Sequence, residues 1–299
     1  MARSRRSFHP DVLRWTDLGD MAMGEGIPVN LDPAFKDYKI LAEGDSWFSL
    51  NDLLPRGRVP TNILYNLRFR KSTLIISCAS PGDTMKNMSN ICGNSDLREA
   101  LSRVGYKWDV ILLSGGGNDL LERAQLILLD RSERKANAKK PEDFCSEEEL
   151  SRLIDSIQQN YRRIAQRRDM ESGAAVGQPV ITHTYDYVTP RNSPARFVNI
   201  PVSGPWVYKE FEAAQIPKKY WIELSGYLLE RLAEGLLALE DPETGIENFH
   251  VVNTLGTLVP ANIDDTGESN DWINEFHPSG DGYKKIVKKW YRVLDKVLG

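Results

Sequence analysis

Short apolar runs alternate with longer amphipathic stretches along this chain. Runs of strand length recur five times, at residues 39–43, 73–77, 108–113, 179–184 and 249–253. Runs that are apolar on both faces are typical of parallel strands with helices packed on each side of the sheet. The pattern therefore predicts an α/β fold of three layers, α/β/α, with a central five-stranded parallel sheet.

Two longer stretches have the periodicity of helices that bury one face. Apolar residues recur on one side of residues 150–165, and Ser146 with Glu149 forms a plausible capping box just before them. Near the C-terminus, residues 286–297 form a second apolar stripe. It is opposed by Lys284, Lys285, Lys288, Lys289 and Lys296. We interpret this basic face as a solvated surface rather than as a nucleic-acid site.

The alternation of strands and helices begins near residue 38. We therefore expect residues 1–37 to form an N-terminal extension and residues 38–299 to form the main domain. Two segments, 121–145 and 187–220, interrupt the pattern with charged residues or with Pro, Ser and Asn. Both are predicted to be insertions, either overhanging a site at the strand ends or forming plain surface loops.

The composition favours a soluble protein with one substantial core. Hydrophobic residues make up 41% of the 299 residues, and the formal net charge is -4, which gives no general attraction to nucleic acid. No apolar stretch reaches the length of a membrane span, and no secretory leader is evident. Cys78, Cys92 and Cys145 are too few for a disulfide framework, so we expect a cytoplasmic protein. The sequence does not indicate an oligomeric state.

Small and polar residues follow the predicted strands at points where chemistry is common. The carboxyl ends of parallel strands meet at one edge of a sheet, so such residues can converge there. Taken alone, each block is also an ordinary turn, and the glycine run before Asn118 could be a phosphate loop, although it lacks a Gly-Lys-Ser/Thr ending. In order, the blocks are Gly44-Asp45-Ser46, Ser80-Pro81-Gly82-Asp83-Thr84, Ser114-Gly115-Gly116-Gly117-Asn118-Asp119 and Asn274-Glu275-Phe276-His277-Pro278.

Together, these four blocks resemble those of the SGNH (GDSL-type) hydrolase superfamily of serine esterases and lipase-like enzymes. The resemblance implies a flavodoxin-like fold, with Ser46 as the nucleophile and His277 as the general base. It also implies an oxyanion hole made of the backbone N–H groups of Ser46 and Gly82 and the side-chain amide of Asn118. Loss of one such donor typically costs about 3 to 4 kcal/mol of barrier.

The chain departs from the family pattern beside the candidate base. The family usually has Asp three residues before the histidine, and this chain has Asn274 there. An asparagine can orient an imidazole but cannot neutralise an imidazolium. Asp271, Glu275 or Asp186 could supply the missing carboxylate, and we take Asp271 ahead of Asn274 because residues 271–275 form one compact element. Glu275 is equally open to a structural role.

Three further residues are candidates for contact with the substrate. His183 lies at the end of the fourth predicted strand, Asp186 follows that strand, and Trp206 lies in an aromatic-rich loop. Each has a plainer alternative in core packing or buried hydrogen bonding. The sequence has no His-Glu-x-x-His motif and its cysteines are widely spaced, so neither a metal nor another cofactor is expected.

The resemblance implies a serine hydrolase that cleaves carboxylic esters through an acyl-enzyme on Ser46. The expected substrate is a small-molecule ester or an ester of a lipid or sugar. An α/β-hydrolase elbow is disfavoured, because Phe48 occupies the position of the second glycine in Gly-x-Ser-x-Gly. Two alternatives stay open. One is an acyltransferase or carbohydrate deacetylase on the same fold, and the other is a ligand-binding module without turnover.

Overall fold

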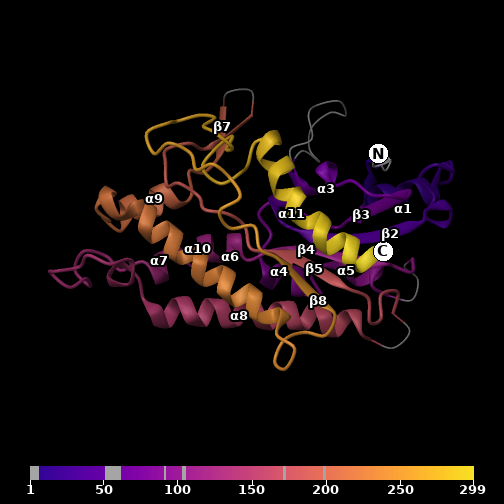
Figure 1. Ribbon diagram of the computed structural model, residues 1–299, viewed down its shortest axis with the longest axis horizontal. Coiled ribbons are helices and arrows are strands. Elements are labelled where there is room, and N and C mark those ends of the chain that lie inside the picture. The colour runs from indigo at the N-terminus through magenta and orange to yellow at the C-terminus, as the bar shows by residue number, and fades with distance from the viewer. Residues whose placement is uncertain (1–6, 51–61, 91, 103–105, 171–172, 198–199) are drawn as a thin grey trace, which may run out of the picture.

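A parallel sheet of six strands forms the centre of the protein (Figure 1). The structure is a computed structural model that describes residues 7–50, 62–90, 92–102, 106–170, 173–197 and 200–299. The strand order is β1-β3-β2-β4-β5-β8, and all five pairings are parallel. The strands are β1 (Asp11–Arg14), β2 (Tyr38–Gly44), β3 (Thr73–Ser77), β4 (Val110–Ser114), β5 (Val180–His183) and β8 (Phe249–Val252).

Helices and short turns of helix connect the strands. The α-helices are α1 (Trp15–Met23), α2 (Ser46–Ser49), α3 (Ile63–Asn66), α4 (Met85–Ser89), α5 (Ser95–Ala100), α6 (Gly117–Glu122), α7 (Ala124–Ile127), α8 (Glu147–Arg168), α9 (Val207–Ala213), α10 (Trp221–Leu237) and α11 (Gly280–Leu298). The 3-10 helices are η1 (Pro33–Phe35), η2 (Pro141–Phe144), η3 (Lys218–Tyr220) and η4 (Ala238–Glu240). No helix in the described ranges is long and apolar enough to cross a membrane.

Two neighbouring residues of β5 show that both faces of the sheet are covered. The Thr182 hydroxyl lies 2.9 Å from the hydroxyl of Tyr161 on α8, whereas the His183 ring lies 5.7 Å from the ring of Trp290 on α11. Successive side chains of a strand point to opposite faces. Helices α8 and α11 therefore cover opposite sides, which confirms the predicted α/β class with helices flanking a parallel sheet.

The sheet has one strand more than the five that the sequence predicts. The five expected strands are present within one or two residues of their predicted ends, and the sixth is β1, which pairs with β3 from Asp11↔Leu74 to Arg14↔Ser77. β1 is a four-residue edge strand whose only apolar residues are Val12 and Leu13. Its pattern in the sequence is too short to distinguish from a loop. β1 lies within residues 1–37, the segment predicted to be an N-terminal extension, and it adds an edge strand to the central sheet.

The two segments predicted to be insertions both attach to the core through buried apolar side chains. In residues 121–145, Ile127 and Phe144 are buried, and Leu128 forms an isolated bridge with Cys145. In residues 187–220, Val188 and Phe211 are buried. This second segment also contains an antiparallel pair, β6 (Ala195–Phe197) and β7 (Ile200–Ser203).

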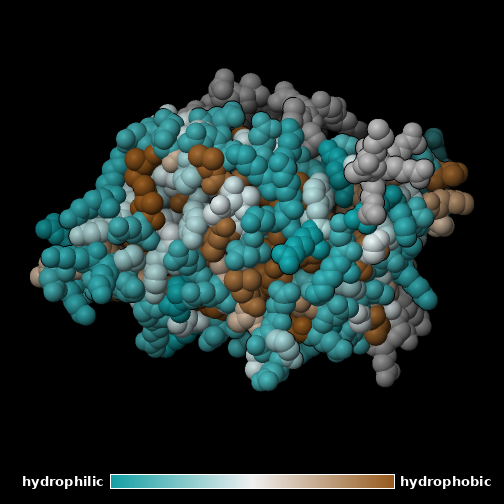
Figure 2. All heavy atoms as spheres, viewed as in Figure 1, coloured by the Kyte–Doolittle hydropathy of each residue, from teal (hydrophilic) through white to brown (hydrophobic). Residues whose placement is uncertain are grey.

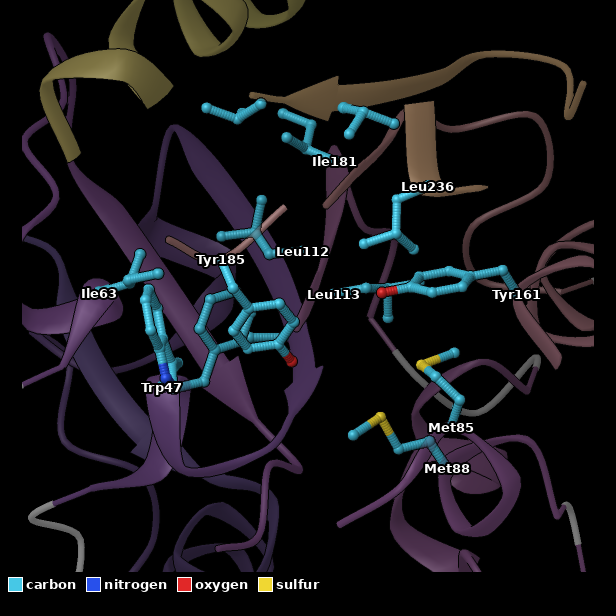
Figure 3. Packing of buried hydrophobic residues seen from close by; sticks show 14 of the residues in the cluster. Trp47, Ile63, Met85, Met88, Leu112, Leu113, Tyr161, Ile181, Tyr185 and Leu236 are labelled. Atoms are coloured by element: carbon cyan, nitrogen blue, oxygen red, sulfur yellow. The ribbon is translucent and has the colours of Figure 1, made fainter. Parts of the chain in front are cut away.

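The core extends across the sheet between the helical layers. Trp47, just after the nucleophile candidate, lies beside Ile63 and Tyr185, while Met85 and Met88 of α4 pack near Tyr161 (Figure 3). The face of the molecule that carries α11 is mainly hydrophilic, with apolar side chains gathered in patches between the polar ones (Figure 2). The lysine-rich side of α11 is thus the outer side, as its amphipathic pattern predicts.

Candidate active site

Ser46 stands at the carboxyl end of β2, where the strand turns directly into a helix. It is the first residue of α2, and Asp45 caps this short helix by accepting the Trp47 backbone N–H at 2.9 Å. An Asp in the cap position satisfies a helix N–H that has no partner within the helix. The turn brings the Ser46 side chain to the edge of the sheet with 7% of its surface exposed.

His277 reaches this serine from the loop between β8 and α11. Its Nε2 lies 2.7 Å from the Ser46 Oγ, although the two residues are 231 positions apart in the chain. Within this loop, Trp272 forms isolated antiparallel β-bridges with Ser269 and with Pro278. A nucleophile and a base in hydrogen-bond contact are the minimum arrangement for covalent catalysis by serine.

Asn274 is the residue that holds the other side of the His277 ring. Its Oδ1 lies 3.1 Å from His277 Nδ1 and accepts the backbone N–H groups of Phe276 at 2.9 Å and His277 at 2.8 Å. Two backbone donors require an oxygen at this position, so the amide orientation is determined. Because Oδ1 can only accept, Nδ1 must carry the ring hydrogen, and the Nε2 lone pair faces the Ser46 hydroxyl.

Asp271 does not occupy the place beside the imidazole that the sequence analysis preferred for it. Its carboxylate accepts the Val259 backbone N–H at 2.7 Å and forms a salt bridge with Lys285 at 2.6 Å. These contacts connect the loop after β8 to α11. The geometry therefore assigns the ring contact to Asn274 and a structural role to Asp271.

Burial determines the charge state of the candidate base. The desolvated site lowers the pKa of His277 from 6.5 to about 4. The hydrogen-bond partner of its Nδ1 is a neutral amide, which offers no charge to oppose this shift. At neutral pH the imidazole is uncharged and able to accept a proton.

Gly82 and Asn118 lie on the two loops that follow β3 and β4. Gly82 has φ +84°, a left-handed conformation that favours glycine, and an added Cβ would meet no atom within 4 Å. The backbone conformation is therefore a sufficient reason for glycine in this protein. Asn118, the second residue of α6, donates from Nδ2 to the Asp83 carbonyl at 2.9 Å. This bond connects the two loops directly.

His183 is part of a buried network behind the serine and does not reach the surface where a substrate would bind. It is fully buried, its Nε2 lies 2.9 Å from Ser114 Oγ, and its Nδ1 accepts the Tyr185 backbone N–H at 3.2 Å. Ser114 donates in turn to Asp45 at 2.8 Å. Burial lowers the pKa of His183 to about 3 and raises that of Asp45 to about 6. In place of the expected substrate contact, this imidazole supports the cap of α2.

Asp186 is also buried, and its carboxylate organises a loop. It accepts backbone N–H groups from Tyr187 and Gly256, both at 2.7 Å, and from Thr257 at 2.9 Å and Leu258 at 2.7 Å. Desolvation raises its pKa even so. Within the described part of the chain, its hydrogen bonds are with backbone N–H groups, so the structure supports a structural role here as well.

Trp206 is the substrate candidate that lies against the candidate catalytic base. It is partly exposed, and its ring packs edge-on against His277 with 5.4 Å between the ring centres. Its backbone N–H donates to the carboxylate of Glu275, which also accepts from Val207 at 3.1 Å and Tyr208 at 2.6 Å. Glu275 thus connects the histidine loop to the first turn of α9.

Arg191 supports the site in a way that the sequence does not reveal. It is fully buried, and its Nη2 donates to the Asn274 carbonyl at 2.8 Å while Nη1 donates to the Asp265 carbonyl at 3.0 Å. Arginine is seldom fully buried, and the polar loop around residue 191 offers no pattern from which to predict it. Among the residues described, no group of three or more His, Cys, Asp or Glu side chains could hold a metal ion.

Comparison with known proteins identifies the family. The model of the GDSL-like lipase/acylhydrolase family matches residues 49–290. The chain belongs to this family. It is a hydrolase of the esterase type. The matched range of this GDSL-type hydrolase begins three residues after Ser46, so the serine is placed by the geometry of the site rather than by the match.

Several solved structures are similar to this GDSL-type hydrolase at low sequence identity. A protein of Chitinophaga pinensis described as a possible lipase is 16% identical, with 87% of this chain and 98% of that chain covered and a TM-score of 0.45. The carbohydrate acetylesterase Est24 of Sinorhizobium meliloti is 12% identical (87% and 98% covered, TM-score 0.43). The aryl esterase of M. smegmatis is 13% identical (87% and 99% covered, TM-score 0.43). No curated protein sequence matches this chain significantly.

Proposed function

We propose that the protein hydrolyses carboxylic esters through an acyl-enzyme formed on Ser46, with His277 as the general base. The observation that carries the proposal is the 2.7 Å hydrogen bond between His277 Nε2 and Ser46 Oγ. A module that only binds a ligand has no need for a neutral imidazole held against a serine hydroxyl. The lowered pKa of His277 adds support, because the base must be uncharged when substrate arrives.

In the first half of the reaction, Ser46 Oγ attacks the ester carbonyl and its proton passes to His277 Nε2. The bond to the alcohol oxygen then breaks, and His277 returns the proton to that oxygen as the alcohol leaves. In the second half, water attacks the acyl-enzyme and gives its proton to His277. His277 then protonates Ser46 Oγ as the carboxylic acid departs. Asn274 keeps Nδ1 as an N–H donor throughout.

The oxyanion of the tetrahedral intermediate would be stabilised by three donors. We assign these to the backbone N–H groups of Ser46 and Gly82 and to the amide of Asn118. The Asn118 amide nitrogen carries two hydrogens, and the bond from it to Asp83 fixes the direction of the other. Donors fixed in advance need no reorganisation as charge develops on the oxygen.

Hydrolysis of a series of chromogenic esters of increasing acyl length tests the proposal. Ser46→Ala is expected to lower turnover at least about a thousandfold, as removal of a serine nucleophile does elsewhere. The matched control is Ser156→Ala on the exposed face of α8, which should leave turnover and melting temperature unchanged. Turnover retained in a folded Ser46→Ala protein would refute the nucleophile assignment.

A further inference from the structure

A polar cavity of about 380 Å³ opens beside the loop that carries Gly82. This loop contributes Ser80 and Asp83 to the lining, and the segment from α4 to α5 contributes the other side. The lining there includes Asn87, Asn90, Asn94 and Asp96. The volume lies within the range of pockets that bind small molecules. Asp83 also touches the candidate active site, because its backbone carbonyl accepts the Asn118 amide.

The cavity is connected to the candidate active site by hydrogen bonds at both ends of one short loop. At one end, the Ser80 N–H donates at 2.9 Å to the carbonyl of Gly44, two residues before Ser46. At the other end, the Asp83 carbonyl accepts the Asn118 amide at 2.9 Å. Gly82 lies between these two fixed points. Asp83, the next residue after Gly82, lines the cavity, whereas Ser46, Gly82 and Asn118 do not. An ester whose carbonyl binds at Gly82 and Asn118 would therefore lie next to the residue at which the cavity begins.

Apart from Cys78 and Gly93, the residues that line the cavity carry polar side chains that suit hydroxyl groups. Side-chain amides and hydroxyls both donate and accept hydrogen bonds, as sugar hydroxyls do. Asp83 and Asp96 add acceptors, and none of the described residues that line the cavity is a Lys or Arg that would balance them, which disfavours an anionic ligand. An alkyl group placed there would displace water from these polar groups without replacing its hydrogen bonds, which disfavours an apolar alcohol.

Hydrogen bonds to the protein fix the side chain of Asn94, one residue of the lining. Asn94 donates to the buried carboxyl of Glu43 at 2.8 Å, and its own Oδ1 accepts the Leu97 N–H at 3.1 Å as the cap of α5. The side chains of Asn87 and Asn90 are exposed, so they are available to a ligand. The lining thus combines one asparagine whose side chain is fixed by hydrogen bonds with two whose side chains are accessible.

We propose that this cavity binds the alcohol portion of the ester and that this portion is uncharged and rich in hydroxyl groups, as in an acylated neutral sugar. The inference rests on the proposed function, because it needs an ester bound at Ser46. It goes further by naming the substrate class and the residues that select it.

Two acetate esters with the same acyl group and different alcohols test the inference. One is a monoacetylated methyl glycoside and the other is butyl acetate, and the measured quantity is the ratio of their kcat/KM values. In the double variant Asn87→Ala/Asn90→Ala, the ratio of glycoside to butyl ester is expected to fall about tenfold, from the loss of hydrogen bonds to hydroxyl groups. Asn137→Ala, an exposed asparagine outside the cavity, is the matched control and should leave the ratio unchanged.

The outcomes separate this inference from the function on which it rests. A wild-type protein that hydrolyses both esters in a Ser46-dependent way, with a ratio that the double variant does not change, overturns the inference alone. If neither ester is hydrolysed and Ser46 does not react with an organophosphonate, the proposed function fails and the inference fails with it. Melting temperatures of both variants equal to that of the wild type exclude misfolding as the cause.

Discussion

At the residue scale, the imidazole of His277 is hydrogen-bonded to an amide oxygen, that of Asn274, instead of to a carboxylate. In a serine protease, Asp to Asn at the equivalent contact costs about 10⁴ in turnover because it leaves the wrong tautomer. Here two backbone N–H groups fix the oxygen of Asn274 toward the ring, so the productive tautomer is kept. What Asn274 lacks is only the charge that would stabilise an imidazolium.

The acidic limb of the pH–rate profile follows from this arrangement. His277 has its pKa lowered to about 4, so the neutral form that accepts the proton persists as the pH falls from 7 to 5. We expect kcat/KM for a chromogenic ester to stay level over that range and to fall as the pH drops through about 4. A profile that already falls near 6.5, the ordinary value for histidine, would contradict the assigned environment.

Replacement of the Asn274 amide by a carboxylate should shift the acidic limb of the pH–rate profile. In Asn274→Asp, a negative charge beside Nδ1 favours the imidazolium, so the pKa of His277 rises and the acidic limb shifts to higher pH. The pH–rate profile of this variant measures the shift, with Asp271→Asn as the matched control. The control removes the salt bridge to Lys285 and should lower stability without moving the limb. Equal shifts in both variants would contradict the assignment.

Residue-scale prediction from the sequence reaches Ser46 and His277 because each belongs to a recognisable block at a strand end. The structure brings these two side chains together. The choice between Asp271 and Asn274 could not be made, because it depends on which side chain faces the ring across a loop. The compact element 271–275 favoured Asp271 as the source of a carboxylate, whereas the loop turns that carboxylate toward Lys285. The choice between substrate contact and a structural role was likewise open for His183 and Asp186, because the sequence does not show which side chains are buried.

At the element scale, the candidate site depends on how the loop after β8 meets α9. The carboxylate of Glu275 accepts N–H groups from the first turn of α9, and burial raises its pKa to about 7. The same carboxylate also accepts the backbone N–H of Arg191 at 3.2 Å. The Glu275 side chain therefore connects the histidine loop both to Arg191 and to the first turn of α9.

Removal of the acceptors at Glu275 should loosen this junction. Glu275→Gln places an amide N–H₂ against backbone donors, so at least one N–H loses its partner at a cost of about 1 to 3 kcal/mol. We expect a lower free energy of unfolding in urea and a lower kcat through misplacement of His277. Glu212→Gln on the exposed side of α9 is the control. An unchanged free energy of unfolding in Glu275→Gln would show that the junction does not depend on this carboxylate.

The elements themselves could be predicted wherever their pattern was long or strongly apolar. The five strands β2, β3, β4, β5 and β8 follow from their apolar runs, and the helix α8, with its Ser146 cap, follows from periodicity. β1 could not be predicted, since two apolar residues at the edge of a sheet carry no period. Short helices such as α2 depend on capping by a single residue, Asp45, rather than on an amphipathic stripe.

At the scale of the whole molecule, the sheet carries an ionisable group in its core. Glu43 of β2 is fully buried, and it accepts hydrogen bonds from the Gly44 N–H and the Asn94 amide, both at 2.8 Å. Desolvation raises its pKa from 4.5 to about 8. The folded protein therefore keeps a proton on Glu43 at neutral pH, whereas the unfolded chain releases it.

Stability should consequently depend on pH through this residue. The raised pKa means that its contribution is fully present below about 4.5 and is lost as the pH rises toward 8, by on the order of 4 kcal/mol. In Glu43→Gln, the free energy of unfolding should be lower at pH 5, because one donor loses its partner, but should fall less between pH 5 and 8. Parallel curves for variant and wild type would contradict the raised pKa.

The overall α/β class could be predicted from the sequence, and the polar cavity could not. Its lining comes from loops whose asparagines look like ordinary turn residues in the chain. Only the folded arrangement shows that Asn87 and Asn90 line the same hollow as Asp83, next to the loop that carries Gly82.

Labelling with a serine-reactive organophosphonate tests the central claim most directly. After reaction and proteolysis, mass spectrometry should locate one adduct, on Ser46 of the wild type, and the labelling rate should fall sharply in His277→Ala. Absence of any adduct, or an adduct on another serine with Ser46 unmodified, would contradict the account.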